Sequence, residues 1–398
     1  MNKMIAVIRK KVFHLREKRD FLRDILLILI SSFGGFLLSL TGMTIGWMVG
    51  TMTAAACLSL FRPSPLKAAV RQNGIHHGWL QFGQMLLGIE LGQKINMSVI
   101  SIFKENWLIV GVMLLLSVVF AMLSGFVLWR FSKTDMLTSF VGTAPGGLSA
   151  MPGIAQEVGA NTAIVSLVQM IRVLLVVMTI PFFVFFINAK QPDAHTAGSQ
   201  VIAAGTSAFE APHIAWTALI VLGGFGVCKA MKALRFPAPW LLGSMTGAAV
   251  LQIAGASMTG LSATAWWPHG FSVLSQICLG ATIGSKISKE MFIGVRKTLI
   301  VALASSVGLI IAMILSAAVT AKAAGISLTT AILAFAPGGI AEMATTSVTL
   351  HADSTFVVAV QVLRVVLVIA MLPPFFRLLQ QKSEKYSHPR MKKVRAEG

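Results

Sequence analysis

Two arginines stand where a charge needs either a partner or a ligand. Arg172 and Arg364 each lie about ten residues into an apolar segment of more than twenty, a depth close to the middle of a bilayer. An unpaired charge there costs about 2.5–3.5 kcal/mol on insertion scales. Gln169 and Gln361 precede the arginines by three residues, so amide and guanidinium share one helical face that suits a carboxylate or another oxyanion. The alternative is that each arginine holds backbone carbonyls of a nearby broken helix and binds no substrate.

The sequence A-P-G-G occurs twice, at residues 144–147 and 336–339. Proline lacks an N–H and glycine adopts backbone angles that a helix forbids, so each copy predicts an interrupted helix. Matched interruptions in two halves of a membrane protein indicate a transport site, although a kink that only helps helices to pack is the alternative. We expect the substrate-binding residues to be Pro145, Gly146, Gly147, Gln169, Arg172, Pro337, Gly338, Gly339, Gln361 and Arg364.

The two copies differ in their acidic residues. Glu342 follows the second A-P-G-G where the first copy has Ala150, and Asp353 stands where the first has Asn161. A carboxylate beside a broken helix can bind a proton or a cation and couple it to transport. We therefore expect ion coupling at Glu342 and, as a weaker candidate, at Asp353. The alternatives are a counter-charge for Arg364 and, for Asp353, an ordinary loop position.

The composition indicates a membrane protein. Of the 398 residues, 56% are hydrophobic and only 12% are charged, against about a quarter charged in soluble domains. The net charge of +19 lies in the tails and short loops, which favours topology and lipid contact over direct binding of nucleic acid. Neither metal-ligand spacing nor a nucleophile–base pair is found, so we expect no enzyme, no metal and no cofactor.

The apolar segments fall into two similar sets. The A-P-G-G motifs lie 192 positions apart (336 − 144), and Q-x-x-x-G-x-x-x-G recurs at the same offset, beginning at Gln84 and Gln276. W-x-x-G recurs at an offset of 193, beginning at Trp47 and Trp240. This spacing predicts an internal duplication. We expect a basic cytoplasmic tail (1–23), a first membrane repeat (24–188), a linker (189–213), a second membrane repeat (214–380) and a basic cytoplasmic tail (381–398).

Loop charges distinguish parallel from inverted repeats, because loops rich in Lys and Arg face the cytoplasm. If all six apolar runs of each half crossed the membrane, the basic loops 229–235 and 286–297 would face outside. If the A-P-G-G run enters and returns, these loops and both termini lie inside. We therefore predict an all-α integral membrane protein with two inverted repeats. Each repeat has about five transmembrane helices plus a broken or re-entrant A-P-G-G segment.

The stretches T-A-P-G-G-L-S-A-M and F-A-P-G-G-I-A-E-M, together with the repeated W-x-x-G, resemble the AbrB family of membrane proteins over roughly residues 25–380. The resemblance implies an internally duplicated protein of the bacterial inner membrane. Members of this family are described as regulators of gene expression or as ammonia monooxygenases, and this sequence has no metal ligands for the latter activity. The family is similar to the cation/proton antiporter and anion transporter group, whose members are inverted-repeat carriers.

These observations favour a secondary carrier of a small organic anion or amphiphile, with its site between the two A-P-G-G segments. The alternative is a membrane-embedded regulator of gene expression that acts indirectly, as a sensor. The expected partners are the lipid bilayer and a small-molecule substrate. A homodimer is also possible. We expect a multi-pass protein of the bacterial inner (cytoplasmic) membrane.

Overall fold

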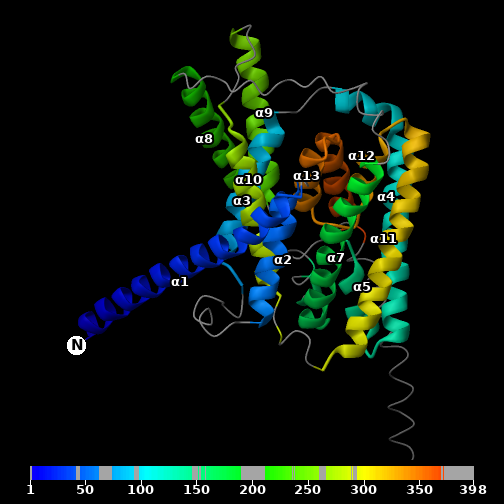
Figure 1. Ribbon diagram of the computed structural model, residues 1–398, viewed down its shortest axis with the longest axis horizontal. Coiled ribbons are helices and arrows are strands. Elements are labelled where there is room, and N and C mark those ends of the chain that lie inside the picture. The colour runs from blue at the N-terminus through cyan, green and yellow to red at the C-terminus, as the bar shows by residue number, and fades with distance from the viewer. Residues whose placement is uncertain are drawn as a thin grey trace, which may run out of the picture. The chain divides into compact units, whose positions relative to one another are not determined.

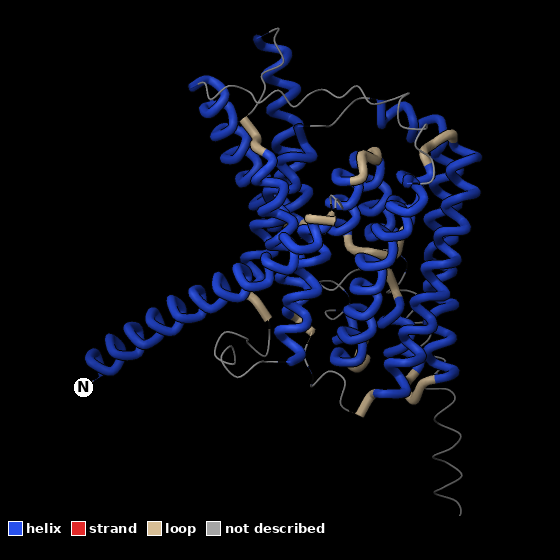
Figure 2. Tube along the Cα trace, in the orientation of Figure 1, coloured by secondary structure: helices blue, strands red, loops and turns tan. Residues whose placement is uncertain are grey.

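The computed structural model describes residues 2–41, 45–61, 74–93, 98–145, 151, 154–156, 158–189, 211–234, 236, 238–259, 266–287, 289, 294–368 and 371. Within these ranges every regular element is a helix, which confirms the all-α prediction for this part of the chain (Figure 2). Gly146, Gly147, most of the linker 189–213 and the basic tail 381–398 lie outside the described residues.

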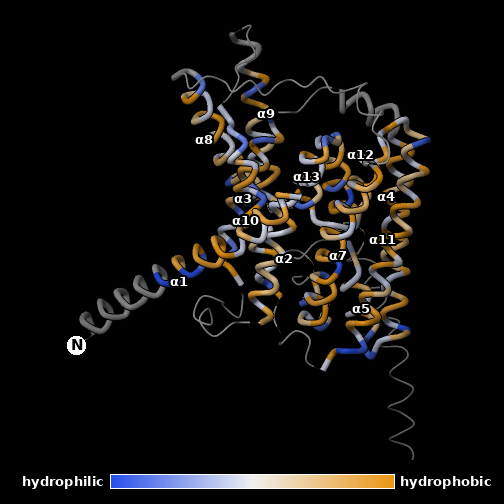
Figure 3. Tube along the Cα trace, in the orientation of Figure 1, coloured by the Kyte–Doolittle hydropathy of each residue, from blue (hydrophilic) through white to orange (hydrophobic). Residues whose placement is uncertain are grey.

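Five helical segments in the described ranges are long and apolar enough to cross a membrane. They are Arg19–Ser39, Trp107–Phe131, Thr162–Val184, His213–Ala233 and Arg296–Ala324, and two shorter apolar helices are Gly46–Phe61 and Ser354–Val368. Figure 3 shows apolar colouring along much of α4 (Ser98–Phe131) and α11 (Arg296–Ala324). On α11 the side chains at every fourth position are both apolar and exposed: Ile311 by 54%, Leu315 by 64% and Val319 by 69%. A continuous exposed apolar stripe of this kind fits a surface that faces lipid.

The segment 1–23, predicted to be a basic tail, is helical. It belongs to α1, which runs from Asn2 to Ser39 without a break. The basic segment contains no proline, and its first glycine is Gly34, so nothing in its backbone chemistry ends the helix earlier. Charge marks the change of environment here, but it does not stop the helix.

The chain forms two compact units, and each unit draws on both predicted repeats. Unit 1 comprises residues 1–95 and 183–290, and unit 2 comprises residues 96–182 and 291–398. Unit 1 contains α1, α2 (Gly46–Phe61), α3 (His77–Gln93), α8 (Ala211–Ala233), α9 (Pro239–Thr259) and α10 (His269–Ser285). Unit 2 contains α4, α5 (Met136–Thr143), most of α7 (Thr162–Ala189), α11, α12 (Leu328–Phe335), α13 (Ile340–Thr349) and the helix Ser354–Val368. Figure 1 labels all of these helices except the last. The predicted repeats are therefore stretches of sequence that do not coincide with compact bodies.

Unit 1 is built on two close helix crossings at glycines. Gly88 of α3 lies against α9 so tightly that an added Cβ would overlap the carbonyl oxygen of Leu241. Gly280 of α10 lies against α2, and an added Cβ would stand 2.5 Å from the carbonyl oxygen of Met48. One turn later, Gly92 and Gly284 make the same approaches to α9 and α2. Small residues allow membrane helices to pack this closely, which explains the glycines of the repeated Q-x-x-x-G-x-x-x-G pattern.

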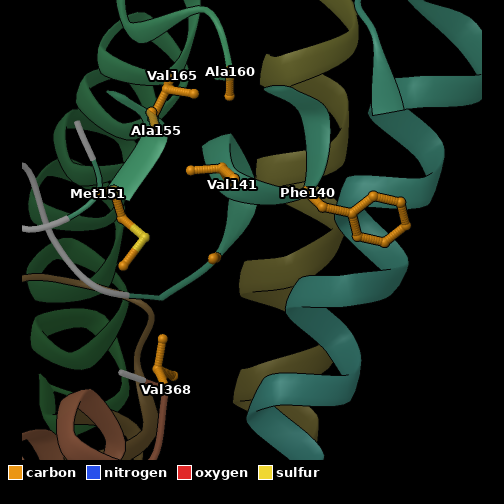
Figure 4. Close-up of a cluster of buried hydrophobic side chains, with 8 residues drawn as sticks. Phe140, Val141, Met151, Ala155, Ala160, Val165 and Val368 are labelled. Carbon is orange, nitrogen blue, oxygen red and sulfur yellow. The ribbon is translucent and has the colours of Figure 1, made fainter. Parts of the chain in front are cut away.

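Unit 2 has two apolar clusters that bring distant segments together. In one, Leu128 of α4, Ile171 of α7 and Ala302 of α11 are buried together, and α4 runs beside α11 (Figure 1). In the other, Phe140 and Val141 of α5 share a cluster with Val368, which lies more than two hundred residues later. Figure 4 shows Val368 below the α5 side chains, on the side of the cluster where Met151 also points. The second cluster therefore joins both halves of the sequence beside the first A-P-G-G.

Both A-P-G-G motifs follow a short helix in unit 2. α5 ends at Thr143, and α12 ends at Phe335. After α12 the residues Ala336–Gly339 are not helical, and α13 begins at Ile340. The first motif is described through Pro145 only. In each case the helix ends one residue before the alanine, as expected where a proline follows closely.

Candidate functional site

Arg172 joins α7 to the end of α5. Its Nη1 donates to the carbonyl oxygens of Thr143 at 2.8 Å and Ala144 at 3.2 Å, and its Nη2 donates to Gln169 Oε1. Gln169 Nε2 donates to the same Ala144 oxygen at 2.8 Å and to that of Val141 at 3.3 Å. Gln169 is fully buried and Arg172 is 3% exposed. The pair therefore binds the last carbonyls of α5, which have no partner within their own helix.

Arg364 joins the helix Ser354–Val368 to the end of α12 in the same manner. Its Nη1 donates to the carbonyl oxygens of Phe335 at 3.5 Å and Ala336 at 2.6 Å, and its Nη2 donates to Gly338 at 3.0 Å and to Gln361 Oε1. Gln361 Nε2 donates to Leu333 at 2.9 Å and to Ala336 at 3.2 Å. Each of these partners except Gly338 stands 192 positions after its counterpart around Arg172.

The structural alternative for the arginines thus has direct support. Arg172 donates to two main-chain carbonyls and Arg364 to three, and a cation at a helix C-terminus also interacts favourably with the helix dipole. Hydrogen bonds that involve a charged group contribute about 1.5–3 kcal/mol each. The first task of Arg172 and Arg364 is therefore to hold the broken ends of α5 and α12.

The arginines nevertheless keep unsatisfied charge. The Nε atoms of Arg172 and Arg364 are buried and have no hydrogen-bond partner. Within the described residues neither arginine forms a salt bridge, and the charge of Arg172 acts repulsively on Arg364. Two mutually repelling buried cations form a region of positive potential in unit 2.

Glu342 lies in the first turn of α13, where the helix dipole favours a negative charge. It is 8% exposed, and its carboxylate fills the space that a Cβ on Gly339 would need. Gly339 is the N-cap of α13, so the side chain of Glu342 bends back toward the start of its own helix, as in a capping box. A side chain at the second glycine of the motif would therefore displace this carboxylate.

Pro337 and Gly338 complete the described part of the second motif. A Cβ on Gly338 would stand 3.1 Å from Val176 Cγ1 of α7 and 2.9 Å from Met343 Cε, so this glycine admits close packing. The structure therefore brings Arg364, Gln361 and Gly338 together, and it brings Gln169 and Arg172 together beside Ala144. Gly146 and Gly147 are outside the described residues, and their role stays a prediction.

Asp353 caps a helix. Its Oδ1 accepts from the N–H of Phe356 at 3.0 Å, as Asn161 Oδ1 accepts from the N–H of Ala163 at 3.1 Å and of Ile164 at 3.2 Å in the first half. A capping role accounts for an acid or an amide at this position without any ion. Ion coupling at Asp353 stays a prediction that these contacts do not require.

Two threonines that the sequence patterns did not single out position these caps. Thr138 Oγ1 accepts from the N–H of Asn161 at 2.9 Å, and Thr330 Oγ1 accepts from the N–H of Asp353 at 3.1 Å. Each threonine therefore ties the start of a short helix to the start of the arginine-bearing helix. The offset of 192 between Thr138 and Thr330 was the signal that would have identified them.

Another buried carboxylate belongs to unit 1. Glu90 of α3 is 7% exposed and accepts from Ser272 Oγ of α10 at 2.5 Å. Among the described residues no group of three or more His, Cys, Asp or Glu side chains is placed to hold a metal ion.

Comparison with known proteins agrees with the resemblance seen in the sequence. The family described as "Transition state regulatory protein AbrB" matches residues 47–380. The "Uncharacterized protein YhjN" of Bacillus subtilis (strain 168) is 60% identical over 377 residues, which cover 94% of this chain and 98% of that protein. The "Putative regulator AbrB" of Escherichia coli (strain K12) is 26% identical over 307 residues, covering 76% of this chain and 83% of that protein. Because the match extends over most of its length, this chain belongs to the AbrB family.

Proposed function

We propose that the chain is a secondary carrier of a small organic anion, bound in unit 2 between the two A-P-G-G segments. The observation that carries this proposal is the pair of buried guanidinium groups, each without a carboxylate partner among the described residues. Buried charges are normally paired, because an unpaired buried ion is strongly destabilising. A bound anion would provide the missing counter-charge.

The donors available to such an anion are the two Nε–H groups. The Nη groups of Arg172 and Arg364 already hold carbonyls, so their positions are set before any ligand arrives. An anion such as a carboxylate would accept from an Nε–H group and offset the repulsion between the arginines. Pre-positioned donors of this kind lower the ordering cost of binding.

The inverted arrangement of the repeats is part of the proposal, and the packing of unit 1 supports it. α3 of the first half packs on α9 of the second, and α10 of the second half packs on α2 of the first, through glycines 192 positions apart. Reciprocal contacts are what a pseudo-two-fold axis produces. The loop charges favour an axis in the membrane plane, with both termini in the cytoplasm of a bacterial cell.

Glu342 is the proposed coupling residue. It is buried, it lies beside the second broken helix, and the first half has no acid at the corresponding position. Protonation of its carboxylate would make the region around Arg364 more positive and so favour an anion. This linkage predicts anion uptake together with a proton.

Transport by purified protein in liposomes tests the proposal directly. Liposomes that contain the chain should accumulate at least one labelled mono- or dicarboxylate from a panel when a pH difference is imposed. Arg172→Lys and Arg364→Lys keep a charge but lose the guanidinium fork, and we expect each to reduce uptake at least about tenfold. Lys322→Gln on exposed α11 is the matched charge control and should transport normally. Full-rate transport by the double Arg→Lys variant would remove the site assignment.

Glu342→Gln separates coupling from binding. We expect this variant to exchange anion across the membrane without responding to the pH difference. If it still concentrates the anion as the unaltered protein does, Glu342 is not the coupling residue.

A second candidate function is an indirect role in regulating gene expression, favoured by the names of the family and of the Escherichia coli relative. A sensor that signals through its basic tail should lose its effect on transcription when residues 382–398 are removed. A carrier should keep transporting after the same deletion.

A further inference from the structure

Basic side chains from several helices gather at one end of unit 1. The group, called here the basic end, consists of His76, His77, Lys232 and Lys286, and the exposed Lys229 and Lys289 each lie three residues from one of its lysines along the chain. The start of α3 lies beside the end of α10, because the N–H of Ile75 donates to Ser285 Oγ at 3.0 Å. Lys286, His76 and Lys232 all act electrostatically on His77. α3 begins at His77, the last turn of α8 carries Lys232, and Lys286 directly follows α10. The tertiary structure therefore brings together cations that lie far apart in the sequence.

The positive charge of the basic end affects the pKa of His77. Partial burial, followed by the charges of Lys286, His76 and Lys232, lowers the pKa of the His77 imidazole. Asp24 of α1 is buried and accepts from the N–H of His76 at 3.0 Å. Asp20, one turn earlier, is paired with Arg23 at 3.6 Å.

Apolar side chains lie among these cations. Lys229 Nζ stands 5.2 Å from the ring centre of Phe225 and 5.9 Å from that of Trp240, and Lys289 Nζ stands 6.0 Å from the ring centre of Phe61. Phe61 is 72% exposed and Leu234 is 71% exposed. An exposed surface that alternates ammonium groups with aromatic and aliphatic side chains matches the boundary between lipid headgroups and acyl chains.

We propose that the basic end binds the phosphate headgroup of an anionic phospholipid. Lys232, Lys286 and His77 contact the phosphate, and Phe61 and Leu234 lie against the acyl chains. The apolar side chains favour a lipid over a soluble phosphate, because a soluble ion gains nothing from them. Specific anionic lipid would hold the ends of α3, α8 and α10 together, independently of any substrate in unit 2.

Thermal unfolding of the full chain in detergent tests this site. Dilauroyl phosphatidylglycerol, its phosphatidylcholine equivalent and inorganic phosphate are each titrated, and the melting temperature is followed. Phosphatidylglycerol should stabilise the chain more than phosphatidylcholine does. The double variant Lys232→Gln/Lys286→Gln should need at least about fivefold more phosphatidylglycerol for half of the effect. Lys297→Gln/Lys322→Gln removes two exposed lysines from unit 2 and should behave as the unaltered protein.

Other results would overturn the proposal. Equal stabilisation by the two lipids, or equal loss in both double variants, would mean that no specific site exists. Stabilisation by inorganic phosphate to the same extent would assign the site to a soluble ion. If Lys232→Gln/Lys286→Gln does not fold, the exposed single variant Lys232→Gln replaces it and should weaken the phosphatidylglycerol effect about twofold. An unchanged response in that variant would also exclude the site.

Discussion

The two broken-helix regions of unit 2 share their scaffold and differ in their acids. Each arginine, together with a glutamine three residues earlier, donates hydrogen bonds to main-chain carbonyls at corresponding positions. Around the second motif alone, a glutamate bends back over the N-cap glycine of α13. The arginine and glutamine contacts, which both regions share, hold the ends of the short helices in place. The glutamate, which only the second region has, is the better guide to ion coupling.

The arginines should produce the largest effects, and nearly equal ones, if the two regions are built alike. Arg172→Ala and Arg364→Ala each leave buried carbonyls without a donor, and each lost partner costs about 1–3 kcal/mol. We expect each variant to lower the melting temperature far more than Lys322→Ala, which removes an exposed cation. A variant that melts like the unaltered protein would show that its arginine is not part of the scaffold.

Substitution of the glutamines should cause a smaller loss of stability, again similar in the two halves. Gln169→Leu and Gln361→Leu each remove two hydrogen bonds to carbonyls and the acceptor for the neighbouring Nη2. We expect destabilisation of about 1–3 kcal/mol in each, measured by denaturant or thermal unfolding in detergent. A large loss of stability in one half and none in the other would show that the two regions are not held together in the same way.

Gly339→Ala should act on the second region by displacing the carboxylate of Glu342. The added Cβ overlaps the carboxylate of Glu342 and must displace it. We expect loss of the pH response in the transport assay, with modest destabilisation. Gly308→Ala in α11 is the matched control, since a Cβ there meets nothing within 4 Å, and it should be neutral or stabilise by about 0.5–1 kcal/mol. Normal pH-driven uptake by Gly339→Ala would show that the position of this carboxylate is unimportant.

Asp353 should show the smallest effect. Asp353→Asn makes the second cap resemble Asn161, and because the two residue types cap almost equally well, we expect a change of a few tenths of a kcal/mol. Asp353→Ala should cost about 1 kcal/mol. Loss of pH-driven transport in the Asn variant, with stability unchanged, would instead assign Asp353 to ion coupling.

Much of the fold was predictable from periodic apolar segments and from proline and glycine. The second A-P-G-G predicted an interruption, and α12 and α13 lie on either side of residues 336–339. For the arginines, the sequence left two kinds of partner open: an oxyanion ligand or the backbone carbonyls of a nearby helix. Spacing shows that Gln361 and Arg364 share a face, but it cannot show which carbonyls that face meets, because these belong to another helix.

The sequence by itself determined the helical class, the constant offset of 192 positions and the buried position of Arg172 and Arg364. Those features follow from local chemistry: apolar length, backbone freedom at glycine and the cost of a charge in an apolar segment. Only the tertiary structure decided that the compact bodies are not the halves of the sequence. Helices far apart along the chain can approach closely wherever both present small residues, as α3 does with α9 and α10 with α2. Such contacts depend on which surfaces meet in space, and no pattern along one segment contains that information.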